Sequence, residues 1–507
     1  MDKRTLLAVV LSMAVLMIFQ FIYKPAPVVI DNTSVDNVAS VDKADSENLK
    51  ADVVETQTKS LEGSHETAVK NFEVETDNLI VYFNENTGNI NSVRIKNFEH
   101  AGIAPQFQAE KGDYLKVNTL NVKPTKSKIY NNGDKKIVEF DYEKNNVIVS
   151  RQYIIDQSYL ITVKESLANI SDSSIRLPYD VAIGPGLGQG FVDSKYLFSG
   201  PMAYDGKKVK QQKPNKIDKD IEVKDAEWLG YTSKYFAFIK VNTDVKNAIF
   251  KKYNDSAIVK SSAEIILNPK SKDEKSFILF VGPKKYDLLS SYGYDLEKSI
   301  DFGVFSFLAI PMLKVMNIFY GATKNYGWAI ILLTIIIKII TYPLTYKSMS
   351  SMKKMKDLQP KMTEIKEKFK GDAQKMNAAM MELYKKHGVN PMGGCLPMLI
   401  QIPIFFALYK ALLVSIELKG APFIFWLADL SEKDPYYITP ILMGASMFFQ
   451  QKLTPAAGDP IQQKLFLFMP VIFTFMFLNF PSGLVIYWLT NNILSIGQQI
   501  IINKKTA

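Results

Sequence analysis

The sequence predicts a multi-domain membrane protein, in which an α-helical part with six membrane spans is joined to an all-β antiparallel sandwich outside the membrane. Three observations lead to this prediction. Nearly all long apolar runs lie after residue 300, short runs of alternating polar and apolar residues fill the region before it, and lysines gather beside the apolar runs. Much of the net charge of +10 is then explained by the basic loops that membrane proteins keep in the cytoplasm, although ribosomal RNA remains a possible partner.

Residues 1–24 predict an uncleaved membrane anchor with its N-terminus in the cytoplasm. Lys3 and Arg4 precede an apolar run long enough to cross a bilayer, which takes about 20 residues. The small-x-small cleavage site of a signal peptide does not follow before Pro25. Residues 25–70 are polar and almost free of aromatic side chains, so we expect a disordered linker there.

Residues 71–300 predict the antiparallel β-sandwich, on the outer side of the membrane. Apolar and polar side chains alternate from Phe72, from Val93 and from Ile137, as they do in strands with one buried face. Turn-forming Asn and Gly residues at 86–89 separate two of these runs. Many short strands with turns between them are typical of two packed antiparallel sheets.

Residues 301–322 are apolar enough to span a membrane, yet we expect an amphipathic helix that lies in the outer interface and is broken at Pro311. If this segment crossed, residues 347–388 would lie outside the cytoplasm. That loop holds eleven lysines and five acidic residues. Basic loops of this kind stay in the cytoplasm.

Besides the anchor, we expect five spans in the membrane part, residues 325–502. Both termini, including the short tail of residues 503–507, then lie in the cytoplasm. Residues 465–480 are short for a hydrocarbon core of about 30 Å, and local thinning of the bilayer would accommodate them. The five spans are residues 326–346, 397–416, 436–451, 465–480 and 481–502.

The basic loop of residues 347–388 predicts a cytoplasmic hairpin of two helices. Apolar residues recur every three or four positions on both sides of a break at Gly371. Methionine is adaptable and frequent on binding surfaces. The stripe therefore either binds partners or fills the seam between the two helices, and its main residues are Met362, Ile365, Met376 and Met380.

The sequence lacks the patterns of membrane enzymes and pumps. Its three histidines lie outside the predicted spans, and no HExxH, GxSxG or P-loop motif is present. The glycines of residues 184–190 fit neither nucleotide-binding spacing, so we expect a surface loop. We therefore expect no catalysis, no cofactor, no metal ion and no small-molecule substrate.

Lys338 lies near the middle of the predicted span 326–346. A charge at that depth is costly unless it faces protein or water, so it marks a functional site by default. The alternative is that its long side chain reaches back to the interface. Asn491 and Ser495 share one helix face in the last span, where they could make one side of the bundle hydrophilic.

Five motifs of the membrane part resemble those of one known family, the YidC/Oxa/Alb family of membrane protein insertases. The resemblance covers residues 300–502 and extends more weakly to the sandwich, which ends at Phe280-Val-Gly282-Pro283-Lys284 as in the Gram-negative form with a large periplasmic domain. The five motifs are Tyr342-Pro343-Leu344-Thr345, Leu358-Gln-Pro360-Lys361, Asn390-Pro-Met-Gly-Gly394-Cys395-Leu-Pro397, Asp434-Pro435-Tyr436-Tyr437 and Phe480-Pro481-Ser-Gly483-Leu484.

The resemblance implies a five-helix core around a hydrophilic groove that opens to the cytoplasm and the lipid. The family's basic groove residue, usually arginine, falls at Lys338. A nascent hydrophobic segment would slide along the third and fifth spans while its polar flank enters the groove. Lys410 stands where an apolar or aromatic residue is more frequent, and we expect it to extend outward. The groove residues are Lys338, Thr334, Gln401, Tyr487, Asn491 and Ser495, and the slide residues are Phe405, Met443, Phe473 and Trp488.

These observations predict an insertase and chaperone of the bacterial inner membrane. Its expected partners are nascent membrane proteins, the ribosome, the Sec translocon and membrane lipid. A secondary transporter with Lys338 at its substrate site is the first alternative, and it predicts two repeated halves. The sequence shows no such repeat. A passive scaffold that tethers an assembly is the second alternative.

Overall fold

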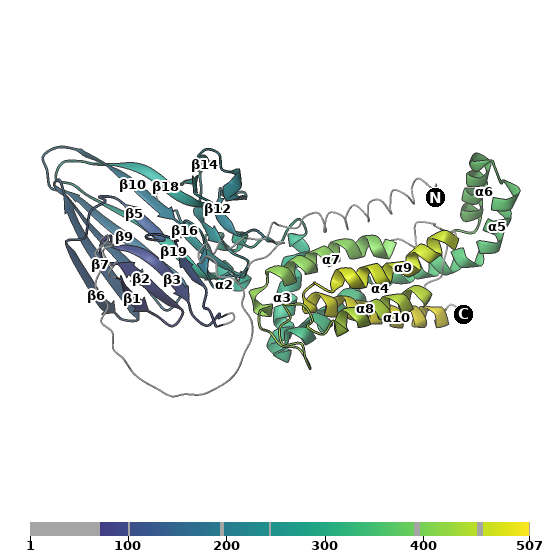
Figure 1. Ribbon diagram of the computed structural model, residues 1–507. Coiled ribbons are helices and arrows are strands. Elements are labelled where there is room, and N and C mark those ends of the chain that lie inside the picture. Colours follow the sequence, from purple (N-terminus) through teal and green to yellow (C-terminus); the bar gives the residue numbers. More distant parts are fainter. Residues whose placement is uncertain are drawn as a thin grey trace, which may run out of the picture. The chain divides into compact units, whose positions relative to one another are not determined.

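The computed structural model describes residues 71–99, 102–192, 197–242, 245–389, 396–453 and 460–505 (Figure 1). The predicted anchor and linker of residues 1–70, and residues 390–395 of the longest motif, lie outside the described residues. The chain divides into two compact units, residues 1–66 and 67–507, and the following description concerns the second.

The first β-sheet has ten strands, and every strand pair in it is antiparallel. Its main order is β1-β2-β3-β5-β10-β18-β17-β14, while β4 pairs with β3 and β11 beside this path. The strands are β1 (Asn71–Glu75), β2 (Leu79–Asn84), β3 (Asn89–Ile95), β4 (Gln106–Gln108), β5 (Leu115–Asn118), β10 (Ile175–Ile183), β11 (Gly188–Gln189), β14 (Ile221–Lys224), β17 (Asn247–Tyr253) and β18 (Ser256–Leu267).

The second sheet has nine strands in the order β13-β12-β15-β16-β19-β9-β8-β7-β6 and is also antiparallel throughout. A short 3₁₀ helix, η1 (Pro214–Lys216), precedes β14. The strands are β6 (Lys126–Asn132), β7 (Lys135–Lys144), β8 (Val147–Ile155), β9 (Leu160–Asn169), β12 (Gly200–Tyr204), β13 (Val209–Gln211), β15 (Trp228–Thr232), β16 (Phe236–Val241) and β19 (Lys272–Pro283).

Side chains from both sheets share one hydrophobic core, which confirms the predicted sandwich. Phe83 of the first sheet packs edge-on against Tyr153 of the second, with ring centroids 5.0 Å apart. The predicted turn at residues 86–89 joins β2 to β3. At Gly188 a Cβ atom would collide with the Gln106 carbonyl, so this glycine allows β11 to pass close to β4.

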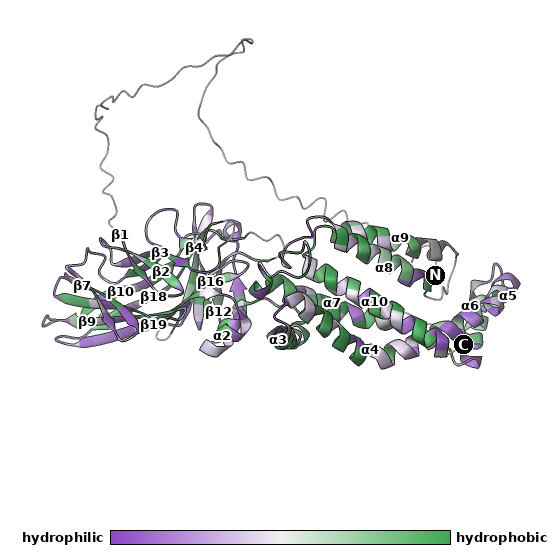
Figure 2. Ribbon diagram, turned by 90° about the horizontal axis from the view of Figure 1, so that it is seen from below, coloured by the Kyte–Doolittle hydropathy of each residue, from purple (hydrophilic) through white to green (hydrophobic). Residues whose placement is uncertain are grey.

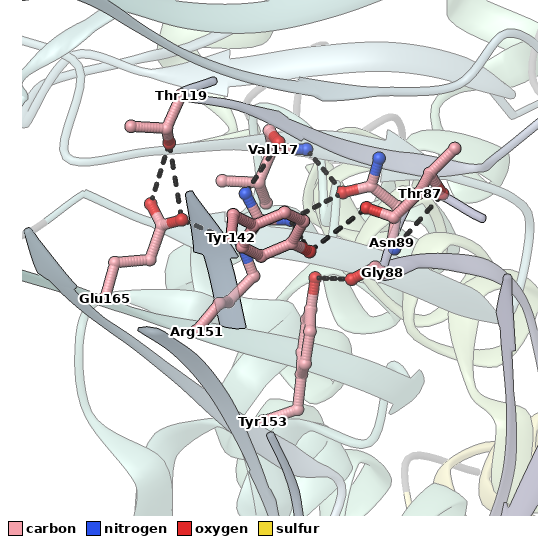
Figure 3. A network of polar contacts seen from close by, with 9 residues as sticks. All are labelled: Thr87, Gly88, Asn89, Val117, Thr119, Tyr142, Arg151, Tyr153 and Glu165. Atoms are coloured by element: carbon pink, nitrogen blue, oxygen red, sulfur yellow. Dashed lines mark hydrogen bonds and ion pairs between the residues drawn. The ribbon is translucent and has the colours of Figure 1, made fainter. Parts of the chain in front are cut away.

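A buried polar network connects the two sheets through Arg151 (Figure 3). Arg151 and Glu165 face each other on β8 and β9, and Arg151 Nε lies 2.8 Å from Glu165 Oε1. The other two guanidinium nitrogens cross to the first sheet, donating to Asn89 Oδ1 at 2.9 Å and to the Val117 carbonyl at 2.8 Å. The charge is therefore both paired and hydrogen-bonded, as burial requires.

Lys284 is a second buried cation, located directly after β19. Its ammonium donates to Thr232 Oγ1 at 2.9 Å. Burial lowers the pKa of Lys284 from its ordinary 10.5 to about 7, against the opposing effect of the Asp301 carboxylate. Over the pH range between these two values, the unfolded chain holds a proton that the folded chain has released.

We therefore expect the free energy of unfolding of the sandwich to rise with pH between about 7 and 10, by at most about 1.4 kcal/mol per pH unit. Lys284→Met should abolish this rise, whereas Lys285→Met, at the exposed next position, should preserve it. Urea unfolding of the full chain at pH 7, 8 and 9 measures the effect. Unfolding of the sandwich is detected by its susceptibility to proteolysis. Equal slopes in the two variants would contradict this assignment.

Three helical segments follow the sandwich: α2 (Tyr286–Tyr292), η2 (Leu296–Ser299) and α3 (Ser306–Thr323). Leu289, Leu296 and Phe302 of this region share a second core with outward-facing residues of β15, β16 and β19. The expected break at Pro311 is wrong, because α3 runs through it. This proline removes a single helical hydrogen bond, the one its nitrogen would donate to the Phe307 carbonyl.

The remaining helices form the helical C-terminal part. Hydrophobic residues dominate α7, α8 and α9, and hydrophilic residues dominate α5 and α6 (Figure 2). The first helix, α4, continues well past the expected end of its span at residue 346. The elements are α4 (Tyr326–Asp357), α5 (Gln359–Lys368), α6 (Ala373–Lys386), α7 (Leu396–Val414), η4 (Ile416–Leu418), α8 (Ile438–Leu453), α9 (Pro460–Phe477) and α10 (Ser482–Lys505).

By length and composition, two helices of the described residues can cross a membrane, α3 and α4. Shorter apolar helical stretches are Leu399–Val414 of α7 and Leu467–Phe477 of α9. Because α3 meets the same criterion as α4, hydropathy does not separate a spanning helix from an interfacial one here. The placement of α3 depends on the charge distribution of the loops.

Candidate functional site: a buried polar layer around Lys338

The buried polar layer is built on α4, whose start is fixed by Asn325. The side-chain oxygen of Asn325 caps the helix by accepting from the backbone N–H of Gly327 at 2.9 Å and of Trp328 at 3.2 Å. From there an almost uninterrupted apolar run favours a helix through the hydrocarbon region. This places Thr334 and Lys338 one turn apart on the same helix face, and both are buried.

Lys338 joins α4 to α10. Its ammonium donates to Ser495 Oγ at 2.7 Å, and Ser495 in turn donates to the Asn491 carbonyl at 2.8 Å. The backbone carbonyl of Lys338 accepts from Gln498 Nε2 at 3.5 Å. The Lys338 side chain therefore points into the helix bundle, and these contacts do not fit the alternative course back to the interface. Only 9% of the residue is exposed.

Two acceptors beside Lys338 lack a hydrogen-bond partner within the described part of the chain, Asn491 Oδ1 and Gln498 Oε1. No carboxylate of the described residues forms an ion pair with Lys338. A buried ammonium in the same layer as amide oxygens that lack a partner suits water or a polar guest, because buried polar groups as a rule find a partner. Thr334 takes no part in this, since its hydroxyl donates to the Ile330 carbonyl of its own helix at 2.7 Å.

Two further hydrogen bonds extend the layer from α10 to other helices. Gln401 of α7 donates to the hydroxyl of Tyr487, a fully buried residue. Asn492 donates to Ser446 Oγ of α8 at 3.0 Å. The structure thus brings Lys338, Asn491 and Ser495 together. Gln401 and Tyr487 form a separate hydrogen bond, which joins α7 to the same helix, α10. Ser446 was missed by the sequence analysis, and only its small polar side chain within an apolar run could have indicated it.

The predicted slide residues separate into a cluster and one outlier. Phe405 of α7 packs against Trp488 of α10 with ring centroids 4.8 Å apart, and Phe473 of α9 stacks on the same Trp488 at 6.0 Å. All three rings are half-buried. Met443 has no exposed surface and belongs to the interior, so the expectation that it contacts a passing segment is wrong. Its burial follows from the packing of α8 against α10.

Lys410 forms an ion pair with Asp301, whose side chain is more than half exposed. Its ammonium lies 3.4 Å from Asp301 Oδ2, and its methylene groups pack beside Gly303. Asp301 also accepts a hydrogen bond from the Gly303 N–H at 2.9 Å. The pair ties α7 to the segment that leads into α3. Its two side chains are partly exposed, so we attribute a positioning role to it rather than a large stability contribution.

Within residues 347–388, the structure places residues up to Asp357 in α4, and α5 and α6 contact each other after it. The break lies at residues 369–372, where Asp372 caps α6 by accepting from the Lys375 N–H at 3.0 Å. Met362, Ile365, Met376 and Met380 are all half-buried. Tyr384 of α6 reaches Met362 Sδ of α5 at 4.0 Å. These contacts favour a stripe that fills the seam between the helices.

The fold and this site define a helical membrane protein with a large β-sandwich domain and a buried polar layer among its helices. A family model described as "60Kd inner membrane protein" matches residues 318–507, and one described as "YidC periplasmic domain" matches residues 71–315. Two relatives are the membrane protein insertases YidC of Geotalea daltonii, 41% identical over 99% of both chains, and of Syntrophus aciditrophicus, 39% identical over the full length of both.

A solved structure of an active YidC insertase aligns with 85% of this chain and 92% of its own at 20% identity, with a TM-score of 0.38. The assignment rests on the sequence relatives, which cover the whole chain. The chain belongs to the YidC family of membrane protein insertases. It is accordingly an insertase of membrane proteins with a periplasmic domain and not an enzyme, as the sequence predicted.

Proposed function

We propose that this insertase works through the polar layer around Lys338, which forms a groove for the polar flank of an entering segment. The observation that carries the proposal is the buried Lys338 ammonium bonded to Ser495, in a layer where Asn491 Oδ1 and Gln498 Oε1 lack a partner among the described residues. A fixed positive charge lowers the cost of bringing an acidic or polar tail to this depth. Burial of the new apolar span then drives the transfer without a covalent step, at roughly 25 cal/mol per Å² of apolar surface.

The apolar part of the entering segment contacts the cluster of Phe405, Phe473 and Trp488. These half-buried rings lie on α7, α9 and α10. More fully exposed neighbours on α7 and α9, Phe406 and Phe475, extend the apolar surface toward the lipid. Aromatic rings supply large contact areas at a low cost in side-chain entropy, which suits a surface that accepts many sequences.

Six spans with both termini in the cytoplasm agree best with the charge distribution. The anchor is the first span, α4, α7, α8, α9 and α10 are the others, and α3 lies in the outer interface. Residues 347–388, with eleven lysines and five acidic residues, then form a cytoplasmic hairpin around α5 and α6. This basic hairpin is our candidate contact for the ribosome, and the Sec translocon is the second proposed partner in the inner membrane.

The topology can be tested with single cysteines in a chain whose native Cys395 is replaced by serine. Thr363→Cys on α5 should be shielded from a membrane-impermeant thiol reagent in intact spheroplasts and labelled after lysis. Asn131→Cys at the end of β6 should be labelled in both. Both positions are exposed on the folded chain, so folding does not hide them. Labelling of position 363 from outside would contradict the six-span arrangement.

Crosslinking to ribosome-bound nascent chains tests the function directly. A photoreactive residue at Phe405 or Phe473 should capture a nascent membrane segment. The same residue at Ile129, an exposed apolar position of the sandwich, should not capture it. A transporter would instead show solute flux into proteoliposomes, and a passive scaffold would show neither flux nor position-dependent crosslinks.

A further inference from the structure

A second surface feature, unrelated to the Lys338 layer, is an apolar slot between α8 and α10 with a volume of about 640 Å³. Its walls are Leu442, Phe449 and Leu453 on α8 and Leu489, Ile493 and Ile496 on α10. The small side chain of Ala445 leaves the gap between Leu442 and Phe449. Behind it, the bond from Asn492 to Ser446 closes the slot toward the bundle interior.

The length of the slot matches one leaflet of a bilayer. Ten residues separate Leu442 from Lys452, which corresponds to about 15 Å along a helix and to half of a hydrocarbon core of about 30 Å. A hydrocarbon chain that lies along the two helices can follow the slot over this length.

A basic residue marks one end of the slot. Lys452 lines this end and is exposed, with its ammonium 4.8 Å from the centroid of the Phe448 ring. None of the ion pairs among the described residues involves Lys452. Lys504, in the last turn of α10, is exposed at the same end of the helix pair. Lysines at the boundary of the hydrocarbon region attract lipid phosphate groups.

We propose that the slot between α8 and α10 binds one acyl chain of an anionic phospholipid, with Lys452 contacting its phosphate group. The assignment of this lipid to the cytoplasmic leaflet rests on the proposed topology, in which α8 and α10 both end in the cytoplasm. The bound chain covers apolar surface of both helices and so stabilises the pair that carries Ser446 and Asn492. Lipid is here a structural ligand of the insertase and not its substrate.

Native mass spectrometry of the full chain tests the proposal. The protein is released from nanodiscs that hold equal amounts of phosphatidylglycerol and phosphatidylcholine with identical acyl chains. The wild type should retain phosphatidylglycerol over phosphatidylcholine by about fivefold, as one lysine near a charged headgroup predicts. Lys452→Gln should abolish the preference but keep a bound lipid. Ala445→Phe should fill the slot and lose the lipid.

Matched controls separate these effects from general changes at the surface. Ile441→Phe adds bulk to an exposed position of α8 outside the slot, and Lys347→Gln removes an exposed lysine of α4. Both should retain lipid like the wild type. Equal retention by Ala445→Phe and Ile441→Phe would overturn the proposal. So would crosslinking of a photoreactive residue at Phe449 to a protein segment instead of lipid. Lipid retention is measured without an insertion assay. A negative result would therefore overturn the lipid site without contradicting the proposed function.

Discussion

Replacing Arg151 with methionine should lower the free energy of unfolding of the β-sandwich by about 3–5 kcal/mol, because it leaves the buried Glu165 carboxylate without its partner. Arg151 and Glu165 are almost fully buried, and Arg151 also donates to Asn89 and to the Val117 carbonyl of the opposite sheet. The substitution therefore leaves a buried charge unpaired and buried acceptors without donors. Hydrogen exchange of peptides from β8 and β9 in the full chain measures this loss.

Arg176 provides the matched control for Arg151. It pairs with Glu264 at 3.5 Å in the same sandwich, but both side chains are more than half exposed. Arg176→Met should cost less than about 1 kcal/mol. The double variant Arg151→Met with Glu165→Met should recover part of the loss, because an apolar pair can replace a buried ion pair. If the double variant is as unstable as Arg151→Met alone, the cost arises from the lost hydrogen bonds to Asn89 and Val117. Equal destabilisation by Arg151→Met and Arg176→Met would contradict the prediction.

The strands that have one buried and one exposed face were predictable, as the alternating burial of β7 and β8 shows. The alternation that begins at Phe72 and at Ile137 corresponds to β1 and β7, and the turn at residues 86–89 joins β2 to β3, whose antiparallel pairing shifts register once, between Tyr82 and Phe83. Arg151 was not predictable, because a charged residue in an alternating run is normally assigned to the exposed face. Its burial depends on Glu165 of the neighbouring strand and on Asn89 of the other sheet, and these pairings arise only in the folded sandwich.

The helical site was predictable only where the residues share a helix face. The four-residue spacing of Asn491 and Ser495 placed both on one side of α10, and the structure adds Lys338, which is 157 residues away in the sequence. The contact of Lys410 with Asp301 spans 109 residues and left no local signal. Met443 was misplaced because apolar side chains occur on both the lipid-facing and the interior side of a membrane helix, so residue type does not distinguish them.

Lys338→Glu should have the largest effect on insertion of any substitution in the polar layer, because it replaces an attractive charge by one that repels acidic tails. Lys338→Arg should be tolerated, since arginine keeps the charge and adds donors for Ser495 and Asn491. Lys338→Ala should slow insertion of a substrate with an acidic tail by about thirtyfold. That factor corresponds to the loss of about 2 kcal/mol of attraction between the Lys338 ammonium and a tail carboxylate about 8 Å from it, at an effective dielectric constant of about 20.

The measurement uses two single-span substrates that differ only in the charge of the translocated tail, with rates normalised to the amount of folded insertase. Lys338→Ala should slow the acidic substrate much more than the neutral one, and Lys347→Ala, an exposed lysine nine residues further along α4, should affect neither. The buried contact with Ser495 makes a purely structural role the main alternative. That alternative predicts loss of folded protein, with the normalised rates of both substrates unchanged or lowered equally. Equal slowing at unchanged protein levels would likewise exclude electrostatic guidance, because only a charge acting on the tail distinguishes the two substrates.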